Sequence, residues 1–316
     1  MHEYRPLAAA EIMSADTEKS LAGRKIGVVG KGGSGKSTAV VLLARALVRC
    51  GYTVCVVDAD STNVGLNQAF GVEQPPAPLI EYFGGMIFGG GLVTCPVDDP
   101  TPLPGAELAL QAMPSDYVAQ AERHLYLLTA GKLTQWGAGG GCDGPISKIA
   151  RDISVRMDAE PLVTLIDFKA GFEDSARGVV TGLDWLIVVV DPTQASLALA
   201  SDIKQMVEGV RTGQLPATRH LDDPDLIALA NRLYQEARLR GASYVLSRIR
   251  DERTESFVRR ELATHAIKPI GTIYEDSAIA NAWLTGAALP FPPTSSDLEG
   301  IISELEQVAK ISSMTT

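Results

Sequence analysis

The 316-residue sequence predicts an α/β fold with a doubly wound, mostly parallel sheet of about seven strands. Two observations predict it. Short apolar runs alternate along the chain with helical stretches, a pattern typical of parallel strands joined by crossover helices. A glycine-rich turn at 30–35 also separates the first apolar run from the first helical stretch. The composition, 46% hydrophobic and 21% charged, supplies enough apolar side chains for a sizeable core.

The strands are expected at the apolar segments of the chain. In order these are 25–30, 53–60, 124–130, 162–167, 185–191, 243–248 and 269–273. The first helix is expected over 37–51, because Gly51 is a natural C-terminal stop.

Residues 1–22 lack the basic and then apolar layout of a signal peptide, so we expect a flexible lead-in. The remainder, 23–316, is expected to form a single domain. Within it, the Gly- and Pro-rich stretch 84–115 predicts a long loop over one edge of the sheet. The stretch 209–242 predicts an added packing helix that begins at Asp223 and is closed by Gly241.

The net charge of −10 argues against several partners. Phosphate surfaces repel an acidic protein, which makes nonspecific binding to DNA or to anionic membranes unfavourable. No apolar run approaches the ~20 residues that span a bilayer. Four irregularly spaced cysteines do not form the disulfide framework of a secreted protein. We therefore expect a cytoplasmic protein that binds neither nucleic acid nor membrane.

The segment GKGGSGKS, residues 30–37, fits the phosphate-loop pattern G-x-x-x-x-G-K-[ST] between an expected strand and an expected helix. Glycines let successive N–H groups point inward around an anion. Lys36 would reach the β- and γ-phosphates, Ser37 would offer a hydroxyl to Mg²⁺, and Thr38 would bond the α-phosphate. The nucleotide-binding residues expected here are Gly32, Gly33, Ser34, Gly35, Lys36, Ser37 and Thr38.

Lys31 is not required by this pattern. Two lysines so close in sequence are physically reasonable if one of them serves a neighbouring nucleotide. Further along the chain, an apolar strand ends in Asp167, a carboxylate placed to hold a Mg²⁺-bound water. Gly171 follows, and its N–H could contact a γ-phosphate and sense its loss.

The loop KGGSGKST resembles the deviant Walker A motif, K-G-G-x-G-K-[ST], of P-loop ATPases of the SIMIBI class. This class includes the nitrogenase iron protein and the MinD and ParA positioning ATPases. In it the first lysine crosses a two-fold interface to the partner's nucleotide. The resemblance implies a Mg²⁺-dependent ATPase that forms a homodimer on binding ATP, with Lys31 and Lys36 catalytic.

Residues 56–67, VVDADSTNVGLN, are similar to switch I of this class, usually D-x-D-P. On that match Asp60 is catalytic: it orients the attacking water or holds the Mg²⁺ shell, while Asp58 is structural. Ser61 replaces the usual proline.

The segment DFKAGFEDSARG, residues 167–178, resembles switch II of the carbon monoxide dehydrogenase accessory ATPases, which support nickel insertion. In that family a Cys-x-Cys pair ahead of a helix binds metal at the dimer interface. Cys142 matches the first cysteine, whereas Gly144 stands in place of the second and Lys169 replaces a glutamate. Segments 79–85, 127–145 and 186–203 resemble the same family in the same order.

Cys142 precedes a helix expected to begin near Pro145, and a thiol at a helix start has more of the metal-binding thiolate. A symmetric dimer would offer two such thiols, so Ni²⁺ or Zn²⁺ would need further ligands, such as Asp143 or water. A buried or incidental cysteine is the alternative. Cys95 is expected to be exposed in the Gly/Pro-rich loop.

The nucleobase pocket departs from the class pattern. Ser247-Arg248 stands where Asn-Lys or Asn-Arg is usual, and Tyr274-Glu275-Asp276 where Pro-x-Asp is usual. The choice of ATP and ADP as ligands therefore follows from the resemblance and not from these residues.

Three functions remain in competition. The first is an ATP-driven maturation factor for a client metalloenzyme. The second is a positioning ATPase of the MinD/ParA type, which would call for a basic helix or a basic patch. The third is an iron–sulfur reductase, for which Cys95 and Cys142 could supply the two thiolates needed from each subunit.

Overall fold

The computed structural model describes residues 19–133, 141–158, 160–171, 178–292 and 295–314. An eight-stranded sheet forms its centre, with all neighbours parallel except β4, which pairs antiparallel with β5 at one edge. In spatial order its strands are β10 (Gly271–Tyr274), β9 (Ala242–Ile249), β8 (Trp185–Val190), β1 (Lys25–Gly30), β7 (Leu162–Asp167), β2 (Thr53–Asp58), β5 (Leu125–Thr129) and β4 (Ala119–Glu122). The doubly wound α/β fold predicted from the sequence is confirmed.

All seven expected strands are present, and five of them differ from the expected bounds by one or two residues at an end. β2 stops at Asp58, so Asp60 already belongs to the loop that follows, and β10 begins at Gly271. The sequence missed β4 because its residues, AQAE, have little intrinsic preference for a strand. It forms because a short turn at His124, whose φ is +63°, brings it back along β5.

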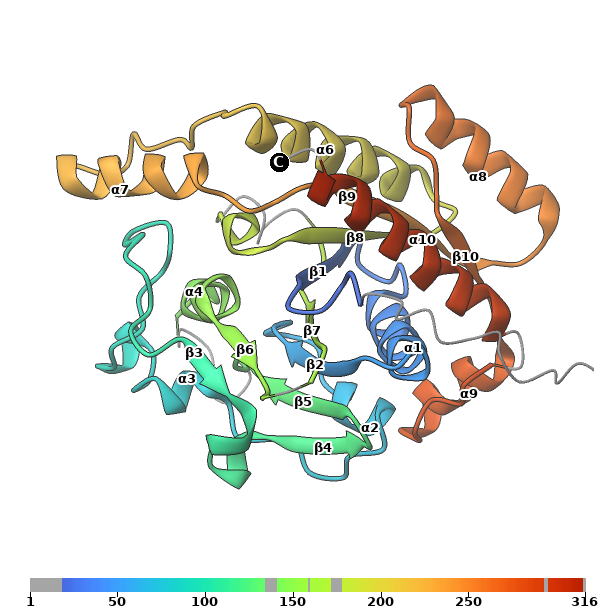
Figure 1. Cartoon of the computed structure of the whole chain (residues 1–316), viewed down its shortest axis with the longest axis horizontal. Helices are drawn as coiled ribbons and strands as arrows, with labels where there is room; N and C mark the ends of the chain where they lie inside the picture. Colours follow the sequence, from blue (N-terminus) through green and yellow to red (C-terminus); the bar gives the residue numbers. More distant parts are fainter. Residues whose placement is uncertain (1–18, 134–140, 159, 172–177, 293–294, 315–316) are drawn as a thin grey trace, which may run out of the picture.

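Helices cover both faces of the sheet, as the strands buried at every position require. One face packs on α1, α2, α9 and α10, and the opposite face on α3, α4, α6 and α8 (Figure 1). The helices are α1 (Lys36–Arg49), α2 (Leu66–Ala69), α3 (Leu79–Tyr82), α4 (Gly144–Asp152), α6 (Gln194–Arg211), α7 (Pro224–Gln235), α8 (Glu252–Thr264), α9 (Ser277–Thr285) and α10 (Ser295–Met314).

Helix α1 follows the phosphate loop and ends as predicted. Cys50 is its C-cap, and Gly51 next to it has a φ of +82°, the left-handed conformation that favours glycine. Helix α10 lies beside α1 (Figure 1), and burial of Ile301 and Leu305 makes it a core-packing helix. None of the described helices is long and apolar enough to cross a membrane.

Part of the expected lead-in and much of the expected long loop pack on the core. Residues 1–18 lie outside the described residues, but Leu21, within the expected lead-in, is buried in the core. The stretch 84–115 buries Met86, Val93 and Leu103 and contains β3 (Glu107–Ala109), which pairs with β6 (Ser154–Arg156). Its glycines allow a compact irregular path, since a Cβ added at position 91 would lie within 2.4 Å of Gly85 backbone oxygen.

Helix α7 begins as predicted, with the Asp223 carboxylate accepting the N–H of Asp225. It ends at Gln235, well before Gly241, and so the predicted closure by Gly241 is wrong. Gly241 instead leaves room for the ring of Trp185, which a Cβ there would meet at 2.6 Å. None of the α7 residues is fully buried, and the helix lies at the periphery of the molecule (Figure 1).

Candidate functional site

The loop between β1 and α1 has the backbone that its glycines predict. Gly33 and Gly35 have φ values of +76° and +86°. Gly30 has no space for a side chain, because a Cβ there would lie 2.6 Å from the Val189 carbonyl oxygen. The Lys36 side chain, 7% exposed, begins α1 and lies inside the loop. A helix N-terminus and a buried cation thus face the same small volume, which favours a phosphate group.

Ser37 and Asp167 meet at the end of β7, where the Ser37 hydroxyl donates to Asp167 Oδ2 at 2.7 Å. Asp167 is fully buried, and its Oδ1 has no hydrogen-bond partner among the described residues. Burial raises the pKa of Asp167 to about 7, although Lys36 opposes that shift. A hydroxyl beside a carboxylate with an unsatisfied oxygen is the type of donor set that fits Mg²⁺.

Asp60 is a second carboxylate near Lys36, in the loop that follows β2. Its Oδ1 accepts the N–H groups of Thr62 and Asn63, each at 3.0 Å, which folds the loop into a tight turn. Its Oδ2 lies 4.0 Å from Lys36 Nζ. Asn63, which the sequence analysis did not identify, donates to the Ser37 hydroxyl at 2.9 Å. One acidic loop therefore contacts both residues that end the phosphate loop.

Lys132 is a second residue that the sequence analysis missed. It follows β5 at the same edge of the sheet, and its ammonium donates to Asp58 at 2.8 Å and to the carbonyls of Asp60 and Asn63 at 2.6 Å each. Burial raises the pKa of Asp58 to about 6, while Lys132 opposes the rise. Asp58 is thus in a structural ion pair. The position of Lys132 shortly after β5, a parallel strand beside β2, was the signal that could have identified it.

The segment after β7 brings Gly171 against the phosphate loop. Gly171 has a φ of +97°, and its N–H donates to the carbonyl of Gly30 at 2.9 Å. To contact a γ-phosphate, this N–H would have to leave Gly30. Lys169 points elsewhere and forms an ion pair of 2.9 Å with Asp143. Residues 172–177 of the predicted switch II lie outside the described residues.

Lys31 lies at the outer side of the phosphate loop and is about one third exposed. Its ammonium donates to the carbonyl of Gly32 at 2.9 Å and lies 3.7 Å from the Asp191 carboxylate. In a single copy of the chain, the Lys31 ammonium thus contacts the backbone of its own loop and lies near Asp191.

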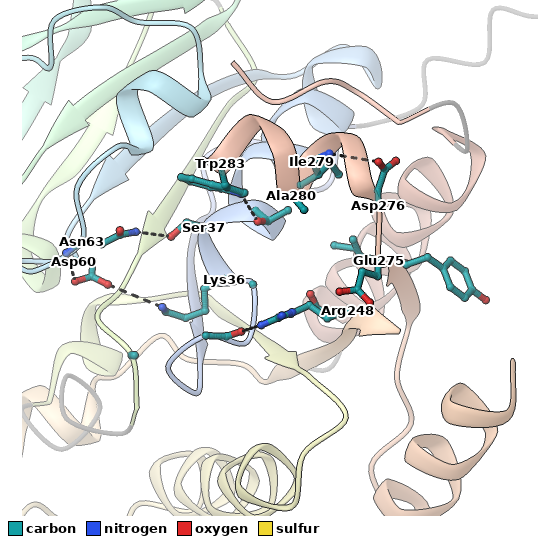
Figure 2. Close-up of a pocket in the computed structure, with 17 residues that line it drawn as sticks. Lys36, Ser37, Asp60, Asn63, Arg248, Glu275, Asp276, Ile279, Ala280 and Trp283 are labelled. Atoms are coloured by element: carbon teal, nitrogen blue, oxygen red, sulfur yellow. Dashed lines mark hydrogen bonds and ion pairs between the residues drawn. The ribbon is translucent and has the colours of Figure 1, made fainter. Parts of the chain in front are cut away.

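A cavity of about 440 Å³ opens from the phosphate loop toward α9, a volume in the range of small-ligand sites (Figure 2). Ser247 and Arg248, which the sequence analysis placed at the nucleobase pocket, line it at the end of β9. Trp283 and Ile279 from α9 complete it, and the Trp283 indole N–H donates to the Thr38 hydroxyl at 2.8 Å. The sequence analysis named only Tyr274, Glu275 and Asp276 beside this helix, because an amphipathic helix gives no sign of which side chains face a ligand.

Arg248 connects the end of β9 to the phosphate loop across this cavity. It has a φ of +56°, an uncommon conformation for a residue other than glycine, and its guanidinium donates to the Gly33 carbonyl at 2.7 Å. Figure 2 shows it between the loop that holds Lys36 and the segment that holds Glu275. Such strain is typical of functional positions.

The cysteines are arranged differently from the expectation. Cys95 is 7% exposed and not on the surface, and burial raises the pKa of its thiol. A Cβ added at Gly144 would lie 2.5 Å from Cys95 Sγ, so this sulfur occupies the space of a side chain at 144. Asp143 is unavailable as the extra ligand we suggested, because it is buried and paired with Lys169. Within the described ranges, no three or more His, Cys, Asp or Glu side chains are grouped to hold a metal ion.

Known proteins resemble the chain in sequence. An uncharacterized ATP-binding protein of Methanocaldococcus jannaschii is 32% identical over 187 residues, 58% of this chain and 73% of that protein. The carbon monoxide dehydrogenase accessory protein CooC of Rhodospirillum rubrum is 31% identical over 194 residues, 60% of this chain and 71% of CooC.

Solved structures show the same fold. The cell division ATPase MinD of Pyrococcus furiosus aligns with a TM-score of 0.55 and 19% identity, over 90% of this chain and 99% of that one. The Pyrococcus horikoshii MinD in complex with Mg-ADP gives 0.56 and 17%, over 92% and 98%. The profile of a P-loop nucleotide-binding family matches residues 26–289, from β1 to beyond α9. The chain belongs to the CobQ/CobB/MinD/ParA nucleotide-binding domain family.

Proposed function

We propose that the chain hydrolyses ATP to ADP and phosphate, with Mg²⁺, in a homodimer that ATP holds together. The observation that carries this proposal is the pair of lysines on one loop. Lys36 is buried inside the loop, whereas Lys31 is about one third exposed, with its ammonium on the Gly32 carbonyl and near Asp191. A lysine placed there has no role for its own nucleotide but can reach one held by a second copy.

Each residue has a separate role in this proposal. Lys36 binds the β- and γ-phosphates, and Lys31 of the second copy neutralises charge that develops in the transition state. The Asp60 oxygen nearest Lys36 orients the attacking water. Ser37 and Asp167 would hold Mg²⁺, which supplies charge neutralisation on the phosphates when bound. Ser247, Arg248 and the α9 face would hold the nucleoside.

Replacement of Lys31 by Ala tests the shared pocket. We expect nucleotide affinity to change by less than about threefold, while ATP-dependent dimers disappear and turnover falls by about 10²-fold or more. Sedimentation velocity with ATP and turnover measured across a dilution series give the two readouts. Lys204→Ala, which removes another partly exposed lysine with a short-range acidic neighbour, is the matched control. Unchanged turnover in Lys31→Ala would refute the role of Lys31 in the second pocket.

We also propose that this ATPase serves a metalloenzyme client, as a maturation factor that handles a metal. CooC, named as an accessory protein of carbon monoxide dehydrogenase, is the relative that suggests it. The position of Cys95 supports it, because its sulfur fills the space beside Gly144 where the Cys-x-Cys pattern would place a second thiol. Burial raises the pKa of the Cys95 thiol, and the backbone N–H groups of Val97 and Asp98 oppose part of that rise. Two chains would then contribute four thiols to Ni²⁺ or Zn²⁺.

The metal content of anaerobically purified protein tests this second proposal. We expect about one transition metal per ATP-bound dimer, lost in Cys142→Ser and in Cys95→Ser and retained in Cys50→Ser. Equal metal content in all four proteins would contradict it. A brown protein with iron, sulfide and visible absorbance would instead favour an iron–sulfur cluster on the same thiols, and thus the reductase alternative.

A further inference from the structure

Asp143 connects two loops that end at the nucleotide site. It is only 4% exposed, and one of its carboxylate oxygens, Oδ2, receives two bonds from different elements. Lys169, two residues after Asp167, donates to it at 2.9 Å. Ser61, the residue after Asp60, donates to it at 3.3 Å. Ser61 and Lys169 are also two positions at which this chain departs from the switch patterns it otherwise resembles.

The register of the sheet explains why these loops meet. β2 and β7 are parallel neighbours, and Asp58 pairs with Asp167 in their register. The chain segments that follow the two strands therefore leave the same edge side by side. Ser61 is fully buried there, and Lys169 is about one quarter exposed.

The other side of Asp143 connects to α4. Its carbonyl accepts both the N–H and the hydroxyl of Ser147, at 3.0 and 3.2 Å, in the first turn of the helix. Asp143 is the N-cap residue of α4, yet its carboxylate caps no N–H of that helix among the described residues. An N-cap aspartate ordinarily uses its carboxylate for that purpose. Here the carboxylate bonds to the two loops instead.

We propose that Asp143 is a positioning residue that transmits the state of the nucleotide site, through Ser61 and Lys169, to the turn formed by Cys142, Asp143 and Gly144. A shift of either loop pulls on a buried carboxylate that is bonded to both of them. Because Cys142 and Gly144 are covalently next to it, the accessibility of Cys142 changes with nucleotide. The coupling is reciprocal, so a ligand at Cys142 alters nucleotide affinity by the same factor. The proposal rests on the proposed function only in taking 60–63 and 167–171 as the loops that respond to ATP.

The rate of alkylation of Cys142 tests the proposal. Full-length protein with Mg²⁺ as its only metal is treated with iodoacetamide, and modification of each cysteine is followed by peptide mass spectrometry. The states compared are nucleotide-free, ADP-bound and bound to a non-hydrolysable ATP analogue. In the unaltered chain we expect the Cys142 rate to differ between the free and analogue-bound states by roughly fivefold or more. Cys50, at the far end of α1, is the internal control with a constant rate.

The variants separate transmission from general loosening of α4. In Lys169→Met and Asp143→Asn the Cys142 rates in the two states should agree within about twofold, while Lys169→Arg, which keeps the cation, preserves the difference. Lys148→Met is the matched control. It removes a lysine of the same helix that pairs with Asp99 at 3.1 Å, and this pair contacts neither loop. It should leave the ratio between states unchanged.

Two results would overturn the proposal. One is a Cys142 rate that does not respond to a bound analogue in the unaltered chain, and the other is an equal loss of response in Lys148→Met. Titration calorimetry of the same samples reports nucleotide binding separately. Failure to bind any nucleotide contradicts the proposed function. The role of Asp143 is then tested in the nucleotide-free protein. There Lys169→Met should speed the alkylation of Cys142, and an unchanged rate would refute the proposal.

Discussion

Single side chains of the nucleotide site bond to partners that come from distant parts of the sequence. Ser37 contacts both Asp167 and Asn63, and Thr38 contacts Trp283, which lies 245 positions further along the chain. The first of these contacts follows from the motif, because Ser37 and Asp167 both lie at the carboxyl edge of the sheet. The contact of Thr38 with Trp283 depends on how α9 packs, and no local pattern specifies it.

Trp283 is expected to report on nucleotide binding. Its indole N–H donates a hydrogen bond to the hydroxyl of Thr38, the group that the sequence analysis assigns to the α-phosphate. Addition of ATP should therefore change the intrinsic fluorescence of the protein, and Trp283→Phe should remove most of that change. We expect the same variant to bind ATP about two- to tenfold more weakly, because it loses one buried hydrogen bond and aromatic contact area. The response should persist in Trp185→Phe, and its persistence in Trp283→Phe would contradict the assignment.

Elements at the scale of one strand or helix were the most predictable features. β1, β2 and β7 are uniformly apolar, and their burial on both faces follows from that composition. β4 and the end of α7 were not predictable in the same way. The pairing of β4 is set by a tight turn and by the neighbouring strand. Helix α7 ends at Gln235, although Ala237 and Leu239 beyond it still pack on the core.

The start of β1 carries a buried lysine with a pH-dependent effect. Burial lowers the pKa of Lys25 from 10.5 to about 7, and its ammonium donates to the Arg151 carbonyl at 2.7 Å. Between those two pH values the unfolded chain binds more protons than the folded one at this position. Stability from this residue therefore rises with pH above 7, by at most about 1.4 kcal/mol per pH unit.

The variant Lys25→Met should lack that rise. Urea unfolding at pH 6, 7.5 and 9 measures it, as the difference in free energy of unfolding between the variant and the unaltered chain. We expect the advantage of the variant to be largest at pH 6 and to shrink by pH 9. A difference that stays constant across the three pH values would show that Lys25 remains protonated in the folded protein.

At the scale of the whole molecule, the fold was predicted from the sequence, and the residues expected at the nucleotide site lie together around one cavity. The phosphate loop is a local signal, and the edge of a parallel sheet collects the residues that follow its strands. Lys132 and Asp143 were not identified as partners of the switch residues because each contact crosses several elements. Cys95 was misplaced for a different reason: a Gly- and Pro-rich segment gives no indication of which of its side chains are buried.

The net charge of −10 predicts how the assembled protein behaves toward polyanions. At 0.15 M salt and with ATP, we expect no retention on nonspecific duplex DNA and no sedimentation with vesicles that contain anionic lipid. Gel-shift and vesicle-pelleting assays test this, with a basic protein of similar size as the positive control. Clear ATP-dependent binding in either assay would favour a positioning ATPase over a maturation factor.

The place of Lys31 has one more implication for the proposed assembly. In a solitary subunit its ammonium already rests near Asp191 and the Gly32 carbonyl. Pairing of two empty subunits would break those attractions merely to form similar ones, so electrostatics offers them little reason to associate. A triphosphate changes that balance, because its concentrated negative charge is a better destination for the lysine than a single carboxylate. Under the proposed function, the empty subunits would stay apart without a separate inhibitor, and ATP itself would be the signal to assemble.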